Sequence, residues 1–223
     1  MATLQTFTQE LVAHLDRPDV SAQVPTAFAR AQALLQRTYL PRFLLRNGVR
    51  ANLTNNVFVL PNDTLRLRAA RLWLPTGLSY ALDEVPETRG RIYERHFISL
   101  VQANQINPQD MFRYGTLPLV FWREGGHVCM LPFTPPQGSY IEIDYYYNPP
   151  VPARPNDTSP WLDNAYDIIF YATSAELRLY LADPDMANLE AQQALLRLKE
   201  LANMDAAYED DYSGPIRIGD GGL

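Results

Sequence analysis

The chain has 223 residues, of which 47% are hydrophobic and 20% charged, so it can bury a sizeable core and is not a wholly disordered chain. Its single cysteine, Cys129, excludes a disulfide framework and a cysteine-based zinc site. No apolar stretch approaches the roughly 20 residues that cross a bilayer, and the N-terminus lacks the basic region of a secretory signal. We therefore expect a folded protein with no membrane partner, made of one elaborated domain or two small ones.

The net charge of −6 is unevenly distributed along the chain. Residues 20–82 contain eight arginines and one acid, Asp63, which gives a net charge of +7. Residues 183–223 contain nine acids and three basic residues, which gives −6. Two oppositely charged parts allow head-to-tail docking with copies of the chain or with a charged partner, and ordinary solvated faces are the alternative reading.

The N-terminal part is expected to form two helices. In the first, Thr3 is the N-cap, Pro18 ends the helix, and apolar residues recur at steps of three and four. These apolar residues are Leu4, Phe7, Leu11 and Leu15. The second helix begins at Pro25, and its shared face consists of Phe28, Ala31, Leu35 and Tyr39. Asn47-Gly48 is then typical of a turn.

The middle of the chain changes to the two-residue period of strands. Short strands are expected at 57–60 and 69–74, and a helix at 87–104. The clearest signal is a hairpin, in which residues 117–123 and 127–131 flank Glu124-Gly125-Gly126. A long strand, 139–147, points Ile141, Ile143, Tyr145 and Tyr147 to one side. We expect this strand to join the hairpin in a three-stranded antiparallel meander.

A proline-rich linker, residues 148–160, leads to a second helical part. Asn164 followed by Asp167 resembles a capping box. The expected buried face of that helix comprises Ile168, Ala172, Ala175 and Leu179. Asp183-Pro184 separates it from a last helix, which runs to about Tyr208. The buried stripe of the last helix comprises Ala187, Ala191, Ala194, Leu195, Leu198, Leu201 and Ala202.

Together these elements predict an α+β fold. A helical bundle built from the N- and C-terminal helices carries an inserted antiparallel β-rich domain and ends in an extended C-terminal tail. The expected divisions are residues 1–50 and 151–211 for the bundle, 51–150 for the inserted domain and 212–223 for the tail.

The sequence contains no convincing catalytic, metal or cofactor-binding site. It has no phosphate-binding loop and no nucleophile elbow. His127 and Cys129 share a strand face but lack further metal ligands nearby. Glu142 and Asp144 also share a strand face, and an exposed edge or subunit contact is favoured over an acid/base pair. We therefore expect no cofactor and no enzyme activity, and two alternatives stay open: a hydrolase using this pair, and weak, non-specific DNA binding through arginines 30–71.

Charged residues indicate a subunit interface instead. The candidates are Arg37, Arg42, Arg46, Arg50, Glu209, Asp210 and Asp211. The three acids follow one another at the end of the last helix, where negative charge opposes the helix dipole. A partner that supplies positive charge would relieve this mismatch.

Several segments together resemble the head-to-tail adaptor proteins of short-tailed bacteriophages, over roughly residues 7–218. In the first half they are Leu15-Asp16-Arg17-Pro18-Asp19, Gln23-Val24-Pro25, Ala31, Arg37 and Val59-Leu60-Pro61. In the second half they are Tyr145-Tyr146-Tyr147, Pro149, Pro150, Pro152, Ser159-Pro160-Trp161-Leu162, Asp167-Ile168-Ile169-Phe170-Tyr171-Ala172, Glu176, Tyr180-Leu181, Asp183 and Tyr212-Ser213-Gly214-Pro215-Ile216-Arg217. The acids Glu209-Asp210-Asp211 depart from the family pattern, which usually has basic residues there, and residues 83–115 match it poorly.

This resemblance implies a structural virion protein at the head-tail junction, assembled in the host cytoplasm. Such a protein forms a ring, generally of twelve copies, beneath the portal protein. The ring extends the DNA channel, lets genomic double-stranded DNA pass without sequence-specific contact, and offers a platform to tail nozzle or tail fibre proteins. Another connector layer, such as a stopper or tail-completion ring, is the alternative within the same assembly.

The resemblance also points to the tail as a contact with the portal or with a neighbouring subunit. The residues concerned are Tyr212, Ser213, Gly214, Pro215, Ile216, Arg217 and Ile218. An extended chain would place Ile216 and Ile218 on one face and Arg217 on the other. Such a segment suits addition along a groove or strand of another protein. We expect it to be mobile in the free protein and ordered in the assembled particle.

Overall fold

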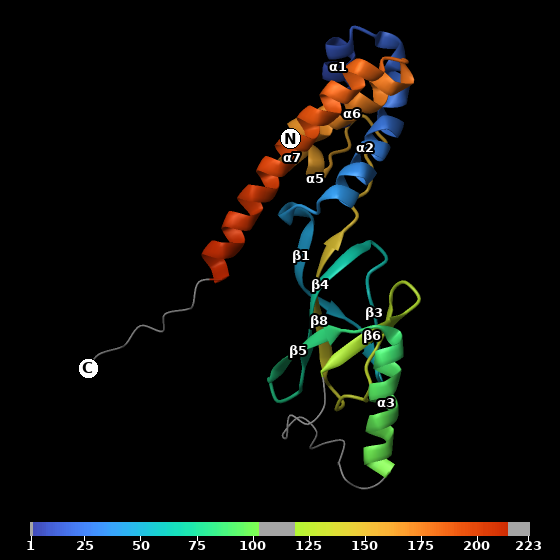
Figure 1. Ribbon diagram of the computed structural model, residues 1–223, viewed down its shortest axis with the longest axis vertical. Coiled ribbons are helices and arrows are strands. Elements are labelled where there is room, and N and C mark those ends of the chain that lie inside the picture. The colour runs from blue at the N-terminus through green and yellow to red at the C-terminus, as the bar shows by residue number, and fades with distance from the viewer. Residues whose placement is uncertain (1, 103–118, 214–223) are drawn as a thin grey trace, which may run out of the picture. The chain divides into compact units, whose positions relative to one another are not determined.

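The computed structural model describes residues 2–102 and 119–213, which form mixed α+β structure (Figure 1). The predicted α+β class is confirmed. The chain divides into two compact units, a helical unit of Met1–Leu44 with Pro149–Leu223 and a β-rich unit of Leu45–Asn148. Residues 103–118 and 214–223 lie outside the described residues, and with them part of the segment 83–115 and the tail residues Gly214 to Ile218.

The helical unit contains the two N-terminal and the C-terminal helices. In chain order its elements are α1 (Leu4–Leu15), the 3-10 turn η1 (Pro18–Gln23), α2 (Val24–Thr38), the 3-10 turn η2 (Arg42–Leu44), α5 (Pro160–Asn164), α6 (Tyr166–Tyr180) and α7 (Pro184–Ser213). The prediction for α1 is confirmed, because the Thr3 hydroxyl accepts from the Thr6 amide at 3.3 Å and the four predicted apolar residues are buried. The second helix begins beside Pro25, as predicted.

Aromatic rings fill the core of the helical unit. The Phe7 ring of α1 lies edge-on to Phe28 of α2 at a centroid distance of 5.5 Å. It also meets Tyr166 and Phe170 of α6 at 5.6 and 6.0 Å. Edge-to-face packing at these distances adds to the stabilisation from buried area. The N-terminal helices are therefore held to α6, which lies more than a hundred residues away in the sequence.

Three expectations for the C-terminal helices are wrong. Asn164 does not cap α6, because residues 160–164 already form α5; the Asn164 amide donates to the Pro160 carbonyl, and the N-cap of α6 is Ala165. Two leucines expected in buried faces are exposed instead: Leu179 of α6 is 56% exposed and Leu195 of α7 is 49% exposed. The last helix does not end near Tyr208, since α7 continues to Ser213, and Tyr212 is therefore helical. Capping residues and helix breakers mark a helix end in the sequence. Residues 208–213 include neither glycine nor proline, so the sequence does not show where α7 ends before Gly214.

The β-rich unit contains one eight-stranded sheet and a helix within its described residues. The elements are β1 (Leu45–Ala51), β2 (Leu53–Thr54), β3 (Val57–Val59), β4 (Thr64–Trp73), β5 (Ser79–Glu84), α3 (Glu87–Gln102), β6 (Val120–Glu124), β7 (Val128–Met130) and β8 (Tyr140–Tyr147). The strand order is β1-β8-β4-β5-β6-β7-β3-β2. Neighbours are antiparallel except β5 and β6, which run parallel. Strand β3 and helix α3 lie where the sequence predicts them, whereas β4 begins at Thr64, five residues before the predicted strand 69–74.

The hairpin is confirmed, whereas the meander is wrong. Strands β6 and β7 pair around Gly125 and Gly126, both of which have positive φ. The other edge of β7 is taken by β3, where Phe58 pairs with Cys129. Strand β8 therefore cannot follow the hairpin, and it lies between β1 and β4 instead.

Asn47-Gly48 marks a bulge within a strand and not the predicted turn. Gly48 has a φ of 65°, and the register of β1 against β8 shifts between Arg46 and Val49. The Gly48 amide donates to the Asp144 carboxylate of β8 at 2.8 Å. A positive φ at glycine serves a turn or a bulge equally well, so the local pattern does not separate the two.

The long strand β8 has the two faces that its alternation predicts. Ile141, Ile143 and Tyr145 are buried in the core of the β-rich unit, and Tyr147 packs partly against it. Phe58, Phe121 and Phe133 from other strands and loops lie in the same core. The opposite face of β8 carries Glu142 and Asp144.

Gly90 of α3 lies where any side chain would strike a buried tryptophan. A Cβ at this position would lie 2.4 Å from Cε3 of Trp122, a fully buried side chain. Gly90→Ala should destabilise the β-rich unit by about 1–2 kcal/mol. Because the added Cβ would meet three ring atoms of a fully buried side chain, overpacking should cost about 2–3 kcal/mol, which outweighs a gain of about 1 kcal/mol in helix propensity.

Urea unfolding of the variant measures this effect. Ser99→Ala is the matched control, because Ser99 is exposed on the same helix and, within the described residues, its hydroxyl donates only to the His96 carbonyl one turn earlier, so the change affects no contact with the sheet. Equal midpoints for wild type and Gly90→Ala would contradict the close approach of α3 to Trp122.

Candidate assembly surfaces

The residues expected at a charged interface fall in both units. Arg37 lies on α2 and Arg42 in η2, both in the helical unit. Arg46 and Arg50 lie on β1 in the β-rich unit. Glu209, Asp210 and Asp211 belong to the last turns of α7, and their side chains lie outside the described part of the structure. The four arginines are thus divided equally between the two units.

Arg42 is engaged by the last helix of its own chain. Its backbone amide donates to the Asp205 carboxylate of α7 at 2.9 Å, and the Tyr39 hydroxyl donates to the same oxygen at 2.8 Å. The Arg42 guanidinium also lies 5.3 Å from the Tyr208 ring centroid. These contacts tie the end of α2 and η2 to the C-terminal half of α7.

The arginines of β1 pack against the tyrosines of their own sheet. Arg46 forms an ion pair with Asp63 at 3.0 Å, and its guanidinium lies 4.0 Å from the Tyr147 ring centroid. Arg50 lies 3.6 Å over the Tyr140 ring. Cation–π contacts of this kind orient an arginine while leaving part of it in solvent.

Glu142 and Asp144 have structural partners on the same sheet. In the strand register Glu142 lies between Arg50 of β1 and Arg71 of β4. Opposite charges at such cross-strand positions stabilise a sheet by about 0.2–1 kcal/mol per pair. Asp144 accepts the Gly48 amide of the bulge. Both carboxylates are thus accounted for without assigning them acid/base chemistry.

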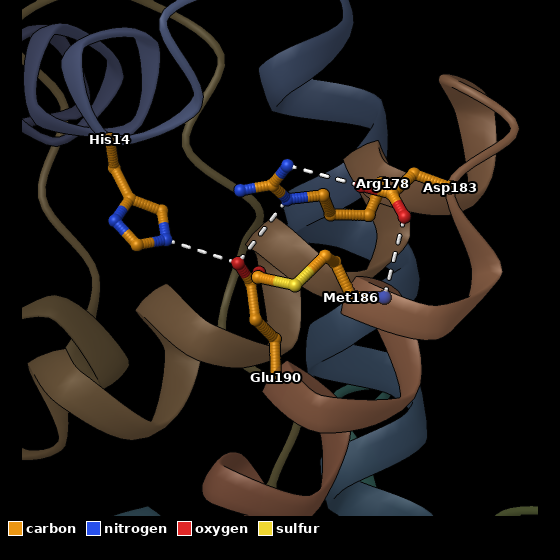
Figure 2. Close-up of polar contacts among 5 residues, drawn as sticks. All are labelled: His14, Arg178, Asp183, Met186 and Glu190. Carbon is orange, nitrogen blue, oxygen red and sulfur yellow. Dashed lines mark hydrogen bonds and ion pairs between the residues drawn. The ribbon is translucent and has the colours of Figure 1, made fainter.

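A buried polar cluster joins three helices of the helical unit, and the sequence interpretation missed it. Figure 2 shows His14 of α1, Arg178 of α6 and Glu190 of α7 converging. One Glu190 carboxylate oxygen meets His14 Nε2 at 3.0 Å and accepts from Arg178 Nε at 3.3 Å. Arg178 also pairs with Asp183 at 3.2 Å, and the Met186 amide donates to Asp183 (Figure 2).

The cluster fixes α7 against α1 and α6. The Glu190 side chain is 5% exposed, so its charge is compensated within the protein. The sequence does carry a signal for it, because Glu190 falls on the same helix face as the buried Ala187 and Ala194. A carboxylate on an apolar stripe requires a cationic partner from another element.

The structure adds three observations about chemistry and membranes. Within residues 2–102 and 119–213, no group of three or more His, Cys, Asp or Glu side chains is placed to hold a metal ion. None of the helices in these ranges is long and apolar enough to cross a bilayer. Cys129 is fully buried, and burial raises the pKa of its thiol to about 12.

The family model for the SU10 adaptor protein matches residues 2–219. The chain belongs to the SU10 adaptor protein family. The match spans almost the whole sequence and both units, and it is consistent with the resemblance to phage head-to-tail adaptors. A comparison with curated proteins finds no match.

Membership of the SU10 adaptor family identifies the chain as a phage structural adaptor protein. An adaptor of a phage particle interacts with other head and tail proteins and is part of the virion. Families of structural adaptors are typically not enzymes, which agrees with the structural partners found for Glu142 and Asp144.

Proposed function

We propose that this protein is the head-to-tail adaptor of a bacteriophage, a ring beneath the portal that continues the DNA channel and presents a platform to tail proteins. The observation that carries the proposal is the family match over residues 2–219. The sequence resemblance to adaptors of short-tailed phages, over roughly residues 7–218, points to the same place in the particle.

The proposed ring contains twelve copies and contacts the portal on one side and nozzle or fibre proteins of the tail on the other. Genomic DNA passes through its lumen without sequence-specific contact, and assembly takes place in the host cytoplasm. In this arrangement the helical unit forms the bundle of the ring, and the β-rich unit is an inserted domain with a separate interface. The division of the chain into these two units supports such a distribution of contacts.

The proposed anchor is the C-terminal segment Tyr212 to Ile218. Its apolar residues Ile216 and Ile218 alternate with Arg217, the pattern of a segment that lies along another protein. Charged residues at the end of α7 and on α2 contribute to contacts between subunits. Arg42, Arg46 and Arg50 already contact groups of their own unit, so Arg37 is the better candidate of the four.

Another connector layer is the second candidate, since the family name does not state which layer the adaptor occupies. Direct contact with the portal separates the two, because a stopper or tail-completion ring does not touch it. A weak DNA-binding module is a third candidate. Its binding to DNA would be non-specific and would be lost at moderate salt concentration.

The free protein should be largely monomeric and should assemble into a ring on the portal. We expect each subunit contact to be weak on its own, and a ring of portal sites brings many of them together, which raises their combined strength. Sedimentation at micromolar concentration, with and without purified portal, measures this. A stable ring in the absence of portal would contradict the expectation.

A further inference from the structure

An apolar groove opens on the surface of the helical unit between α2, α6 and α7. Figure 1 shows α7 running alongside α6 in this unit. Alanines form the floor, and three exposed leucines, Leu34, Leu179 and Leu195, line the groove. These leucines come from three different helices and are 51%, 56% and 49% exposed. Such convergence of exposed large apolar side chains marks an interaction surface.

The size of the groove fits a protein side chain better than a small ligand. Its volume is about 260 Å³. Pockets for small molecules usually measure about 300–1,000 Å³ and bring several polar groups together. Here the polar lining consists of Thr38, Glu176 and Asn188, and alanines and leucines make up most of the rest.

A second apolar surface lies on a different face of α7. Leu189 and Leu196 are 50% and 55% exposed and lie seven residues apart, so they share one side of the helix. Asp185 precedes Leu189 by one turn, and Glu200 follows Leu196 by one turn. Both acids are exposed, and neither forms an ion pair with any residue that the structure describes. We call this surface the outer α7 face, defined by Asp185, Leu189, Leu196 and Glu200.

The rim of the groove on α2 has the complementary charge. Arg30 and Arg37 are exposed on either side of Leu34, at i−4 and i+3. Neither forms an ion pair within the described ranges, and α2 contains no acid. The α2 rim therefore presents a leucine between two arginines, and the outer α7 face presents two leucines between two acids. The two surfaces are complementary in both apolar character and charge.

We propose that the groove receives the outer α7 face of a second copy of this chain. The proposal rests on the proposed function, since it names the contact between neighbouring subunits of the ring. Groove and outer α7 face are different surfaces of one molecule, so each copy can use both at once. A contact of this kind is heterologous and continues from copy to copy until a ring closes.

The chain's own tail cannot fill the groove with its isoleucines. Leu195 lies eighteen residues before Ser213, which is about 27 Å along the helix. Ile218 lies five residues beyond Ser213 and can extend at most about 18 Å from it. Ile216 and Ile218 of the same chain are therefore excluded as occupants, and the charges on α2 select the acidic face of α7 on a second copy.

Cysteine cross-linking tests the contact directly. The experiment uses the full chain, concentrated in solution and separately in assembled particles, with a short bismaleimide. Leu34→Cys with Leu196→Cys in one chain should give a ladder of oligomers that extends beyond dimers. A mixture of the two single variants should give dimers only, and each single variant alone should stay monomeric. The native thiol of Cys129 does not interfere, because it is buried and its pKa is raised to about 12.

The matched control pairs Leu34→Cys with Ile92→Cys. Ile92 is 62% exposed on α3, and this pair should give no ladder.

A ladder that weakens as the salt concentration rises supports the charged rims. Dimers from Leu196→Cys alone, or no ladder in either preparation, would overturn the contact. A ladder lost on deletion of residues 214–223 would put a neighbour's tail in the groove and would equally overturn it. If the purified double variant cross-links in solution but this chain is not found in virions, the proposed function is refuted and the contact between copies still stands.

Discussion

Replacing Glu190 with leucine should destabilise the helical unit by about 2–3 kcal/mol. Breaking a buried ion pair from one side usually costs about 3–5 kcal/mol, because the remaining charge stays buried. Here Arg178 is 18% exposed and keeps Asp183 as a partner, so we expect a smaller effect. Glu190→Gln should cost less than Glu190→Leu, since the amide oxygen can still accept from Arg178.

Amide hydrogen exchange measures this effect in each unit. The amides of α6 and α7 should exchange faster in Glu190→Leu, and those of β4 and β8 should not change, because the strands belong to the other unit. Asp19→Asn is the control, because it removes an ion pair with Arg17 in which both side chains are about half exposed. Unchanged exchange in α7 of Glu190→Leu would show that the cluster does not hold this helix.

Deleting residues 214–223 should abolish stable attachment of the protein to portal-bearing heads. The deletion begins after Ser213, the last residue of α7, and leaves in place every buried side chain of the ranges that the structure describes. Thermal stability should therefore remain close to that of the full chain. The expected loss arises because the tail supplies an apolar edge, Ile216 and Ile218, for a partner's groove.

Point variants make this test independent of chain length. Ile216→Ser with Ile218→Ser should reproduce the loss of attachment, whereas Asp220→Asn, in the same segment, should not. Co-sedimentation with filled heads that lack tails measures attachment. Normal attachment of the truncated chain would refute the tail as the anchor.

The parts of the fold that depend on local chemistry could be predicted from the sequence. Thr3 and the spacing from Leu4 to Leu15 define α1, because a cap and a 3.6-residue period are local properties. The two faces of β8 follow in the same way from its alternation. The pairing of β8 with β1 and β4 could not be predicted, because it depends on long-range contacts and on β3 occupying the edge of β7.

The same distinction applies to the candidate surfaces. Arg42 and Arg46 are visible in the sequence as part of a basic segment, but their contacts with Asp205 and Asp63 appear only in the folded units. The cluster at Glu190 joins residues up to 176 positions apart, beyond the reach of any pattern of spacing. Leu195 was expected in the buried stripe of α7, yet it is 49% exposed, because α2 and α6 cover only part of the helix there.

The central claim is that this adaptor forms a ring directly on the portal. Electron cryomicroscopy of the purified protein mixed with the portal of its phage is the most direct measurement. We expect a single ring in contact with the portal, with one adaptor copy for each portal subunit, a continuous central channel and the C-terminal segment ordered against the portal. Portal particles without added density, or a ring separated from the portal by another protein layer, would contradict this account.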